Sequence, residues 1–364
     1  MTKRRRARRG GDVHNTPLAH LAQAKMGRRA TLAFSLLLAA RGAAGARGAA
    51  RGAPPPQINT SPTIGVLSVP ITGADSPCDT ARVGGKTSCY TAFYNRWIES
   101  AGARAVIIPY DADAATLGAL LGGVNGVLLT GGGLEAAGLA FDAPYMVAAA
   151  AVVAFAKARN DAGVFFPLHG TCQGMQVLAL LAARNASVVE YGAFDAEDLS
   201  IPLDITWDGH HSSRLFSADA APAAVISTLS TRNATLNLHH DGVPVATFEA
   251  SATLTDAYIL LSTNFDRAGR SFVSTIEAWD YPITATQWHP ERPAYEWRAV
   301  GADHSADAVA AMQYIANFFV ADARRNIQSF TDPVLFARYS AFSFPLVGAA
   351  DAATSGFQWL VTDL

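Results

Sequence analysis

The sequence predicts an α/β fold in which helices cover both faces of a mostly parallel sheet. Three observations support this prediction. Short apolar runs alternate with helical stretches from about residue 62 to residue 325. Runs such as 126–129 are continuously apolar, which is typical of strands buried on both faces. Little chain separates one segment from the next, as in successive βαβ units.

The alternation assigns the segments in chain order. Strands are expected at 64–69, 104–108, 126–129, 164–168, 258–262, 272–276 and 283–288. The first helix is predicted from an apolar stripe at helical spacing, which Gly102 ends: Tyr90, Phe93, Tyr94, Trp97 and Ile98. Further helices are expected at 114–121, at 144–158, after Gly174 and at 306–325. The region 190–270 has short β-like runs rich in Asp, Ser and Thr.

Residues 1–57 are expected to form a targeting segment and an Ala/Gly/Pro-rich linker. Arg28 and Arg29 precede an apolar run at 30–40, and small residues follow, which is the pattern of a signal peptide. The run is too short for an ordinary transmembrane helix. The Arg-rich start also fits a long n-region, translation from Met26, a transit peptide or a disordered basic tail. The folded domain is predicted at 58–330, and 331–364 is a C-terminal tail without a structural prediction.

Charge is distributed unevenly along the 364 residues. Residues 1–52 hold 12 of the 28 Lys and Arg residues but only one of the 30 acids. The remainder holds 16 basic and 29 acidic residues, which is a net charge of −13. Nucleic-acid binding is not expected, because phosphates require positive charge for neutralisation.

Three cysteines leave at least one thiol unpaired: Cys78, Cys89 and Cys172. The first two are close in the sequence, and the pattern allows either a disulfide between them or two free thiols. Three sequons are compatible with N-glycosylation, at Asn59, Asn185 and Asn233.

The segment 170–174, with the sequence GTCQG, lies between a predicted strand and a predicted helix. A G-x-C-x-G turn in this context is the cysteine form of a nucleophile elbow. The start of the helix favours a thiolate at Cys172 through its dipole and free N–H groups. The backbone N–H of Gln173 is a candidate oxyanion donor. A buried structural cysteine in a glycine-rich turn is the alternative.

Two further motifs complete a candidate catalytic set. His289-Pro290-Glu291 follows a predicted strand, and Glu291 can return across the proline to orient a basic His289. Residues 130–133, with the sequence TGGG, end another strand, so the backbone at Gly132 can supply the second half of an oxyanion hole. Taken alone, each motif also fits a purely structural role. His289 could be a strand-end histidine capped by a nearby acid, and the glycines could form an ordinary flexible loop.

Two histidine pairs are not expected to bind a metal, namely His210-His211 and His239-His240. Adjacent histidines point in different directions, and no Cys/His framework accompanies them. Neither a metal nor an organic cofactor is predicted.

Together these motifs resemble the γ-glutamyl hydrolase (folylpolyglutamate hydrolase) family, within the class I glutamine-amidotransferase-like superfamily. The resemblance extends from about Pro62 to Arg325 and is most specific at 286–291 (TQWHPE) and 294–297 (AYEW). It implies a flavodoxin-like doubly wound fold and a Cys-His-Glu triad. The implied nucleophile, base and orienting acid are Cys172, His289 and Glu291. The resemblance also implies substrate-binding roles for Tyr90 and His239.

The resemblance further implies cleavage of folylpoly-γ-glutamates through a thioester acyl-enzyme. The sequence departs from the family pattern at Thr130, Gly133 and Gln173, which affects substrate contacts rather than the triad. Because the domain is acidic, a local basic pocket is expected for a polyanionic substrate, with Arg82, Lys86 and Arg214 as candidates. The alternatives are hydrolysis of another small γ-glutamyl amide, a glutaminase-like activity, or an inactive binding protein on the same fold.

The expected destination is the secretory pathway, with the exterior, the vacuole and the lysosome all left open. No membrane association is expected after the signal is cleaved. The small-molecule substrate is the predicted partner, and a homodimer is left open. Chain-length preference and endo or exo cleavage do not follow from the sequence.

Overall fold

The computed structural model describes residues 57–71, 88–297, 299–348 and 358–362. All of them belong to one compact unit, Pro56–Leu364. The predicted signal segment at 30–40 and three residues considered above lie outside the described residues: Cys78, Arg82 and Lys86.

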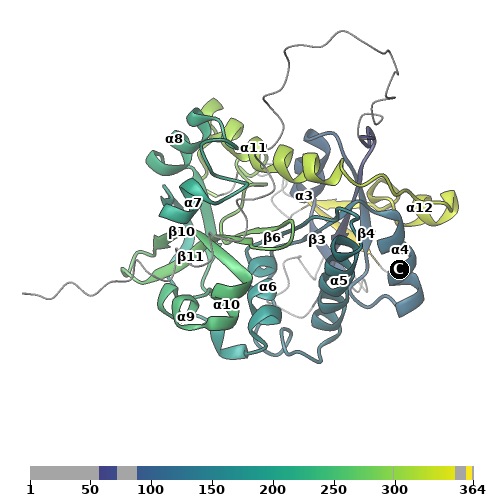
Figure 1. Ribbon diagram of the computed structural model, residues 1–364, viewed down its shortest axis with the longest axis horizontal. Helices are drawn as coiled ribbons and strands as arrows, with labels where there is room; N and C mark the ends of the chain where they lie inside the picture. Colours follow the sequence, from purple (N-terminus) through teal and green to yellow (C-terminus); the bar gives the residue numbers. More distant parts are fainter. Residues whose placement is uncertain (1–56, 72–87, 298, 349–357, 363–364) are drawn as a thin grey trace, which may run out of the picture. The chain divides into compact units, whose positions relative to one another are not determined.

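An eight-stranded sheet forms the centre of this unit, in the order β4-β1-β5-β6-β12-β11-β10-β8 (Figure 1). Five strands are parallel: β1 (Thr63–Leu67), β4 (Arg104–Ile108), β5 (Gly126–Leu129), β6 (Leu168–Thr171) and β12 (Ile283–Thr286). Three antiparallel strands extend it: β11 (Ser271–Ala278), β10 (Tyr258–Phe265) and β8 (Asp204–Ile205). In chain order the parallel strands lie 2-1-3-4-5, which is the flavodoxin-like order. The predicted fold class is confirmed.

The parallel strands bury both of their faces in two separate apolar cores. Successive residues of a strand point to opposite sides of the sheet. In β1, Val66 joins one core and Leu67 joins the other. In β5, Leu128 joins the first core, whereas Val127 and Leu129 join the second. This burial explains the continuous apolar runs in the sequence.

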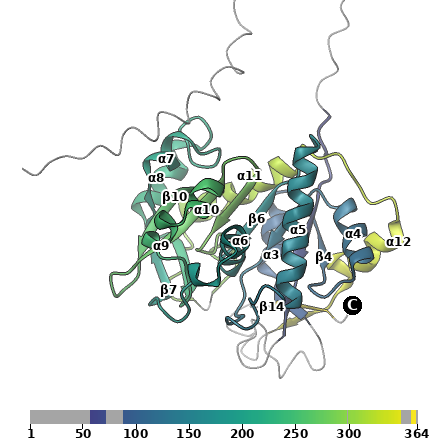
Figure 2. The ribbon, with the colours of Figure 1, turned by 60° about the horizontal axis from the view of Figure 1, so that its bottom comes forward.

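Helices cover each face, as predicted. One face carries α3 (Phe93–Ser100), α8 (Ala223–Thr231) and α11 (Ala306–Ala323). The other carries α4 (Ala114–Gly123), α5 (Pro144–Asp161), α6 (Gln173–Ala183), α9 (Val245–Ala250), α10 (Ala252–Ala257) and α12 (Pro333–Tyr339). Figure 2 brings α5 and α6 to the front of the sheet. The short α7 (Trp207–His211) packs on β10.

Two predicted boundaries are wrong. The strand expected at 164–168 is β6, which begins only at Leu168 opposite Val127. Pro167 precedes it and has no N–H to donate to a ladder. Tyr90 lies in strand β3 (Ser88–Thr91) and not in the first helix, which begins at Phe93. Strand pairing determines this boundary, because β3 is hydrogen-bonded on both of its edges.

The C-terminal segment, left without a prediction, contributes strands as well as α12. β13 (Leu346–Gly348) and β14 (Gln358–Thr362) join β3 and β2 (Val69–Pro70) in a four-stranded sheet. A smaller sheet pairs β7 (Ala196–Ile201) with β9 (Thr235–His239). Short 3-10 turns lie at Ala186–Val188 and Ala341–Ser343. Cys89, in β3, is disulfide-bonded, whereas Cys172 is free.

Within the described ranges, no helix combines the length and the apolar character that a membrane span requires.

Candidate active site

Three neighbouring parallel strands carry the candidate residues at their carboxyl ends. β5 leads into Gly131 and Gly132, β6 leads into Cys172, and β12 leads towards His289. Because these strands are adjacent, motifs that are distant in the sequence meet at one edge of the sheet. Open α/β sheets bind their ligands at this edge.

Cys172 occupies a strained turn between β6 and α6. Its φ of 52° and ψ of −109° lie where L residues are rarely found. The flanking glycines permit the turn. A Cβ at Gly170 would lie 2.7 Å from the carbonyl oxygen of Gly174, and a Cβ at Gly174 would overlap the Leu129 carbonyl. This is the backbone geometry of a nucleophile elbow, with the cysteine at the start of a helix.

His289 and Glu291 form a buried ion pair. Their Nδ1 and Oε1 atoms lie 2.7 Å apart. Burial lowers the pKa of His289, but the Glu291 carboxylate and Cys172 outweigh burial and raise that pKa to about 9. Burial raises the pKa of Glu291, but His289 and Arg292 outweigh it and hold that pKa below its usual value. The Arg292 guanidinium Nε lies 3.3 Å from the same carboxylate oxygen.

Gly131 lies where the cysteine and the histidine approach each other. A Cβ at this position would lie 3.4 Å from Cys172 Cβ and 3.0 Å from His289 Cε1. The Gly131 N–H donates a 2.7 Å hydrogen bond to the hydroxyl of Tyr94. The Nε2 atom of His289 is buried and makes no hydrogen bond of normal geometry among the described residues, although Cys172 lies near enough to raise the pKa of the ring through its charge and a hydrogen bond. That nitrogen is therefore free to exchange a proton with a reacting group.

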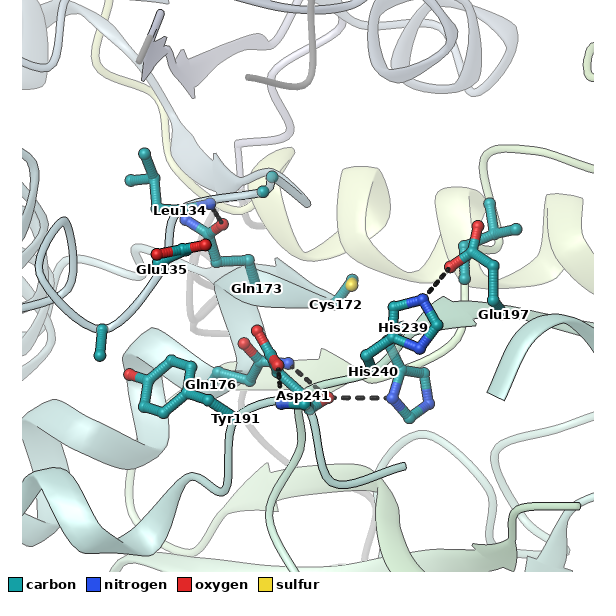
Figure 3. Close-up of a pocket in the computed structure, with 15 residues that line it drawn as sticks. Leu134, Glu135, Cys172, Gln173, Gln176, Tyr191, Glu197, His239, His240 and Asp241 are labelled. Carbon is teal, nitrogen blue, oxygen red and sulfur yellow. Dashed lines mark hydrogen bonds and ion pairs between the residues drawn. The ribbon is translucent and has the colours of Figure 1, made fainter. Parts of the chain in front are cut away.

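A cavity of about 640 Å³ opens beside Cys172. Figure 3 shows the Cys172 sulfur between the Gln173 amide and the two histidines of segment 238–241. The carbonyl oxygen of the Gln173 side chain accepts from the Leu134 N–H at 2.8 Å, which ties the glycine loop to α6. Among the described residues, the lining holds no lysine or arginine, but it holds three carboxylic acids: Glu135, Glu197 and Asp241.

His239 is a buried and neutral residue in the wall of this cavity. Its Nδ1 lies 2.9 Å from the backbone carbonyl oxygen of Asp241. A carbonyl can only accept, so Nδ1 carries the proton and Nε2 carries the lone pair. Burial lowers the pKa of His239 to about 3, so the ring is neutral at physiological pH. Nε2 is buried and has no partner among the described residues.

The structure brings most of the predicted site residues together. Cys172, Gly132, Gln173 and His239 line the cavity. His289, 3% exposed, and the fully buried Glu291 do not belong to the lining. Within the described ranges, no cluster of His, Cys, Asp and Glu side chains is placed to hold a metal ion.

Two residues predicted to contact the substrate do not reach the cavity, Tyr90 and Arg214. Tyr90 is fully buried in β3, where its hydroxyl donates to Asn95 Oδ1 at 3.0 Å. Arg214, a candidate for a basic pocket, does not line this cavity. Its guanidinium forms ion pairs of 2.8 Å with Glu277 and 2.9 Å with Asp322, and those partners hold it away from the lining.

Sequence reasoning missed four residues around the site: Tyr94, Gln176, Gln287 and Arg292. Tyr94 belongs to the same apolar stripe as Tyr90 and cannot be distinguished from it by periodicity. Arg292 directly follows Glu291, so its position beside a predicted acid was the available signal. The two glutamines could not be identified from the sequence, because their contacts with each other and with Cys172 join separate elements.

Known proteins match most of this chain. Residues 64–185, which include Cys172, match the Peptidase C26 family. Gamma-glutamyl hydrolase B of Dictyostelium discoideum is 34% identical over 77% of each chain. Gamma-glutamyl hydrolase 1 of Arabidopsis thaliana is 33% identical over 80% of each chain. The mouse gamma-glutamyl hydrolase is 35% identical over 67% of this chain and 74% of its own. With such similarity over most of both chains, the protein belongs to the γ-glutamyl hydrolase family.

Proposed function

We propose that this protein hydrolyses γ-glutamyl bonds with Cys172 as the nucleophile, His289 as the general acid and base, and Glu291 as the orienting acid. One observation carries the proposal: the strained Cys172 turn and the buried His289–Glu291 pair both approach Gly131. Family membership supports the type of bond, because the matching relatives are named γ-glutamyl hydrolases.

In the acylation step, the Cys172 thiolate attacks the γ-carbonyl carbon of a glutamyl residue and forms a C–S bond. The oxyanion accepts hydrogen bonds from backbone N–H groups at Gly132 and Gln173. Gln173 is in the first turn of α6, where N–H groups have no intrahelical acceptor. The C–N bond then breaks as His289 donates a proton from Nε2 to the departing amine.

In the deacylation step, water attacks the thioester carbon. His289 accepts the water proton at Nε2, the C–S bond breaks and the Cys172 thiolate is restored. Glu291 holds Nδ1 at 2.7 Å, so that the same ring nitrogen faces the reaction in both steps. This scheme uses no metal and no organic cofactor.

We extend the proposal to folylpoly-γ-glutamates as the substrate class, on the strength of the family resemblance. A cavity of about 640 Å³ has the size of an ordinary small-molecule site. Arg82 and Lys86 remain candidates for binding the carboxylates of the tail. Both lie outside the described residues.

A small γ-glutamyl amide with a free ammonium group is the second candidate substrate, and the chemistry of the lining favours it. Glu135, Glu197 and Asp241 attract a cation into the cavity. The neutral His239 adds no positive charge to this lining. A polyanionic folate tail carries the same negative charge as these three acids, which repel it.

The test is to incubate purified protein with a folate pentaglutamate and, separately, with a γ-glutamyl amide that has a free α-ammonium group. Cys172→Ala is the control, and folate products are resolved by chain length. Pentaglutamate cleavage that the variant lacks supports the folate assignment, and the product ladder distinguishes endo from exo attack. Cleavage of the amide alone selects the second candidate. If neither is cleaved and an electrophile fails to label Cys172, the protein is an inactive binder and the proposal is wrong.

We also propose that the chain enters the secretory pathway. The disulfide at Cys89 supports this, since disulfides persist in oxidising compartments. Two of the sequons, Asn185 and Asn233, are exposed, whereas Asn59 is half-buried and donates to the Asn326 carbonyl. Glycosidase treatment of secreted protein should therefore lower its mass by glycans at Asn185 and Asn233. An intracellular, unglycosylated product would contradict the proposal.

A further inference from the structure

We infer that Gln287 is a further catalytic residue, whose side-chain amide donates a hydrogen bond to the sulfur of Cys172. A second glutamine, Gln176, and the backbone carbonyl of Asp241 are positioning groups that fix the direction of this bond. The inference rests on the proposed role of Cys172 as the nucleophile.

Gln287 is held beside the sulfur by the sheet. It directly follows β12, is fully buried, and places Nε2 3.5 Å from Cys172 Sγ. Its backbone N–H donates to the Ser274 carbonyl at 2.8 Å. The Cys172 N–H donates at 2.7 Å to the backbone carbonyl of Thr286, the residue before Gln287. The two residues are therefore fixed to each other through backbone as well as side chains.

The neighbours determine which end of the Gln287 amide faces the sulfur. The shape of an amide does not distinguish its oxygen from its nitrogen, so the hydrogen-bond network must do so. Gln176 Nε2 lies 2.9 Å from the carbonyl oxygen of Asp241, which can only accept. The same NH₂ group lies 3.3 Å from the Gln287 side chain and must meet its oxygen there. The nitrogen of Gln287 therefore faces Cys172.

A donor at this position favours the thiolate over the thiol. Hydrogen bonds to an ionised acceptor are stronger than those to a neutral one. Unlike His289, the amide has no titration of its own, so its effect is present at every pH. The negative charge leaves the sulfur when the C–S bond forms, and the hydrogen bond then weakens. Gln287 thus acts on the formation of the nucleophile and leaves the oxyanion to the backbone N–H groups.

The chain of amides also joins the nucleophile to the wall of the cavity. The Asp241 carbonyl accepts from Gln176 Nε2 and from His239 Nδ1, both at 2.9 Å. One carbonyl therefore orients both the donor chain to Cys172 and the ring of His239 in the cavity wall. The turn after β9 is thereby tied to both α6 and β12.

Gln287→Met tests the inference, because it keeps the length of the side chain and removes the donor. The readout is the rate at which iodoacetamide alkylates Cys172 in the full chain as a function of pH. We expect the midpoint of this profile to rise by about one pH unit. The acid limb of kcat/KM should move with it, whereas the alkaline limb, which reports His289, should stay near pH 9.

Two companion variants and one control sharpen the result. Gln287→Glu places a negative charge beside the sulfur, so its midpoint should rise further. Gln176→Met releases the Gln287 amide and the Asp241 carbonyl but keeps the donor to Cys172, so its midpoint should rise less. The control is Gln313→Met, at a half-buried glutamine of α11 that bonds Ser100 and Asn317 and does not line the cavity, and its profile should match the wild type.

An unchanged alkylation midpoint in Gln287→Met would overturn the inference. If that variant does not fold, an unchanged midpoint in Gln176→Met, which alters a cavity-lining residue, would do the same. This failure is distinguishable from failure of the proposed function. In the latter case wild-type Cys172 would show neither alkylation nor hydrolysis, whereas here both would persist.

Discussion

His169 and His289 are both buried, the first within β6 and the second just past the end of the neighbouring β12, yet their pKa values shift in opposite directions. His169 lies within β6, where its Nδ1 meets the Thr284 hydroxyl at 2.9 Å. The rings of Trp97 and Phe319 lie beside it. Burial lowers the pKa of His169 to about 4, and the attraction of Glu291 offsets this only in part. His289 has that carboxylate on Nδ1, and its pKa rises to about 9.

The contrast shows how the carboxyl edge of the sheet changes the pKa of a buried histidine. Inside a strand, a side chain faces the helix layer, so a buried histidine there is neutral. Past the end of β12, Pro290 turns the chain and Glu291 returns to His289. A buried carboxylate in direct contact reverses the effect of burial, so that the ring stores a proton. Position along the strand, rather than burial, separates a packing histidine from a catalytic candidate.

The largest expected effect comes from exchanging each of the two histidines for glutamine. His289→Gln removes the acid and base, and kcat/KM should fall by about 10³-fold or more. His169→Gln changes only a packed side chain, so thermal stability should fall while kcat/KM stays near the wild type. Kinetics on a γ-glutamyl substrate and a thermal melt measure the two. Equal kinetic losses would break the distinction.

Glu291→Gln should lower kcat by about 10²- to 10³-fold, because the imidazole loses the charge that orients it. The alkaline limb of the pH profile should also move below about pH 9, since Glu291 is what raises the pKa of His289. Glu277→Gln is the matched control at an equally buried acid, 1% exposed, which binds the partly exposed Arg214. It should cost about 1–3 kcal/mol of stability and leave kcat unchanged. A control that also lost kcat would refute the comparison.

The two histidines should give stability profiles of opposite slope. The folded pKa of His289 is raised from 6.5 to about 9, so its contribution is complete below pH 6.5 and lost as the pH rises through 9. The folded pKa of His169 is lowered from 6.5 to about 4, so its contribution is present above pH 6.5 and lost as the pH falls through 4. Urea midpoints across this range measure both.

In such a series, His289→Gln should flatten the alkaline decline and His169→Gln should flatten the acid decline. Identical curve shapes in the wild type and both variants would show that other groups dominate the pH dependence.

The sequence predicts well whatever is decided locally. The strands at 104–108 and 126–129 have the predicted bounds, because an apolar run between turn residues leaves one solution. Cys172 and His289 are marked by glycines and by Pro290, which govern local backbone. The predicted start of β6 is too early, because an apolar run does not show which of its residues pair with a neighbouring strand. Tyr90 was misassigned because pairing of β3 with β2 and β14 overrides helical periodicity.

What depends on distant partners could not be predicted. The ion pairs of Arg214 with Glu277 and Asp322 join three separate elements, and a charge count cannot reveal them. The same holds for Gln176 and Gln287. The orientation of their side-chain amides is determined by the Asp241 carbonyl, which lies on a third segment of the chain. Polar residues at such positions look ordinary until the fold brings their partners together.

The smallest expected effect is a difference in kcat/KM between variants of Tyr94 and Tyr90, the two tyrosines of the predicted apolar stripe. Tyr94→Phe removes the acceptor of the Gly131 N–H, which costs about 1–3 kcal/mol because that group is buried. The Gly131 loop touches both Cys172 and His289, so kcat/KM should also fall, by about threefold to tenfold. Tyr90→Phe is the control, since it breaks only the contact with Asn95. It should lower stability by about 0.5–1.5 kcal/mol without a kinetic change. Equal kcat/KM in the two variants would mean that the position of Gly131 has no influence on the reacting pair.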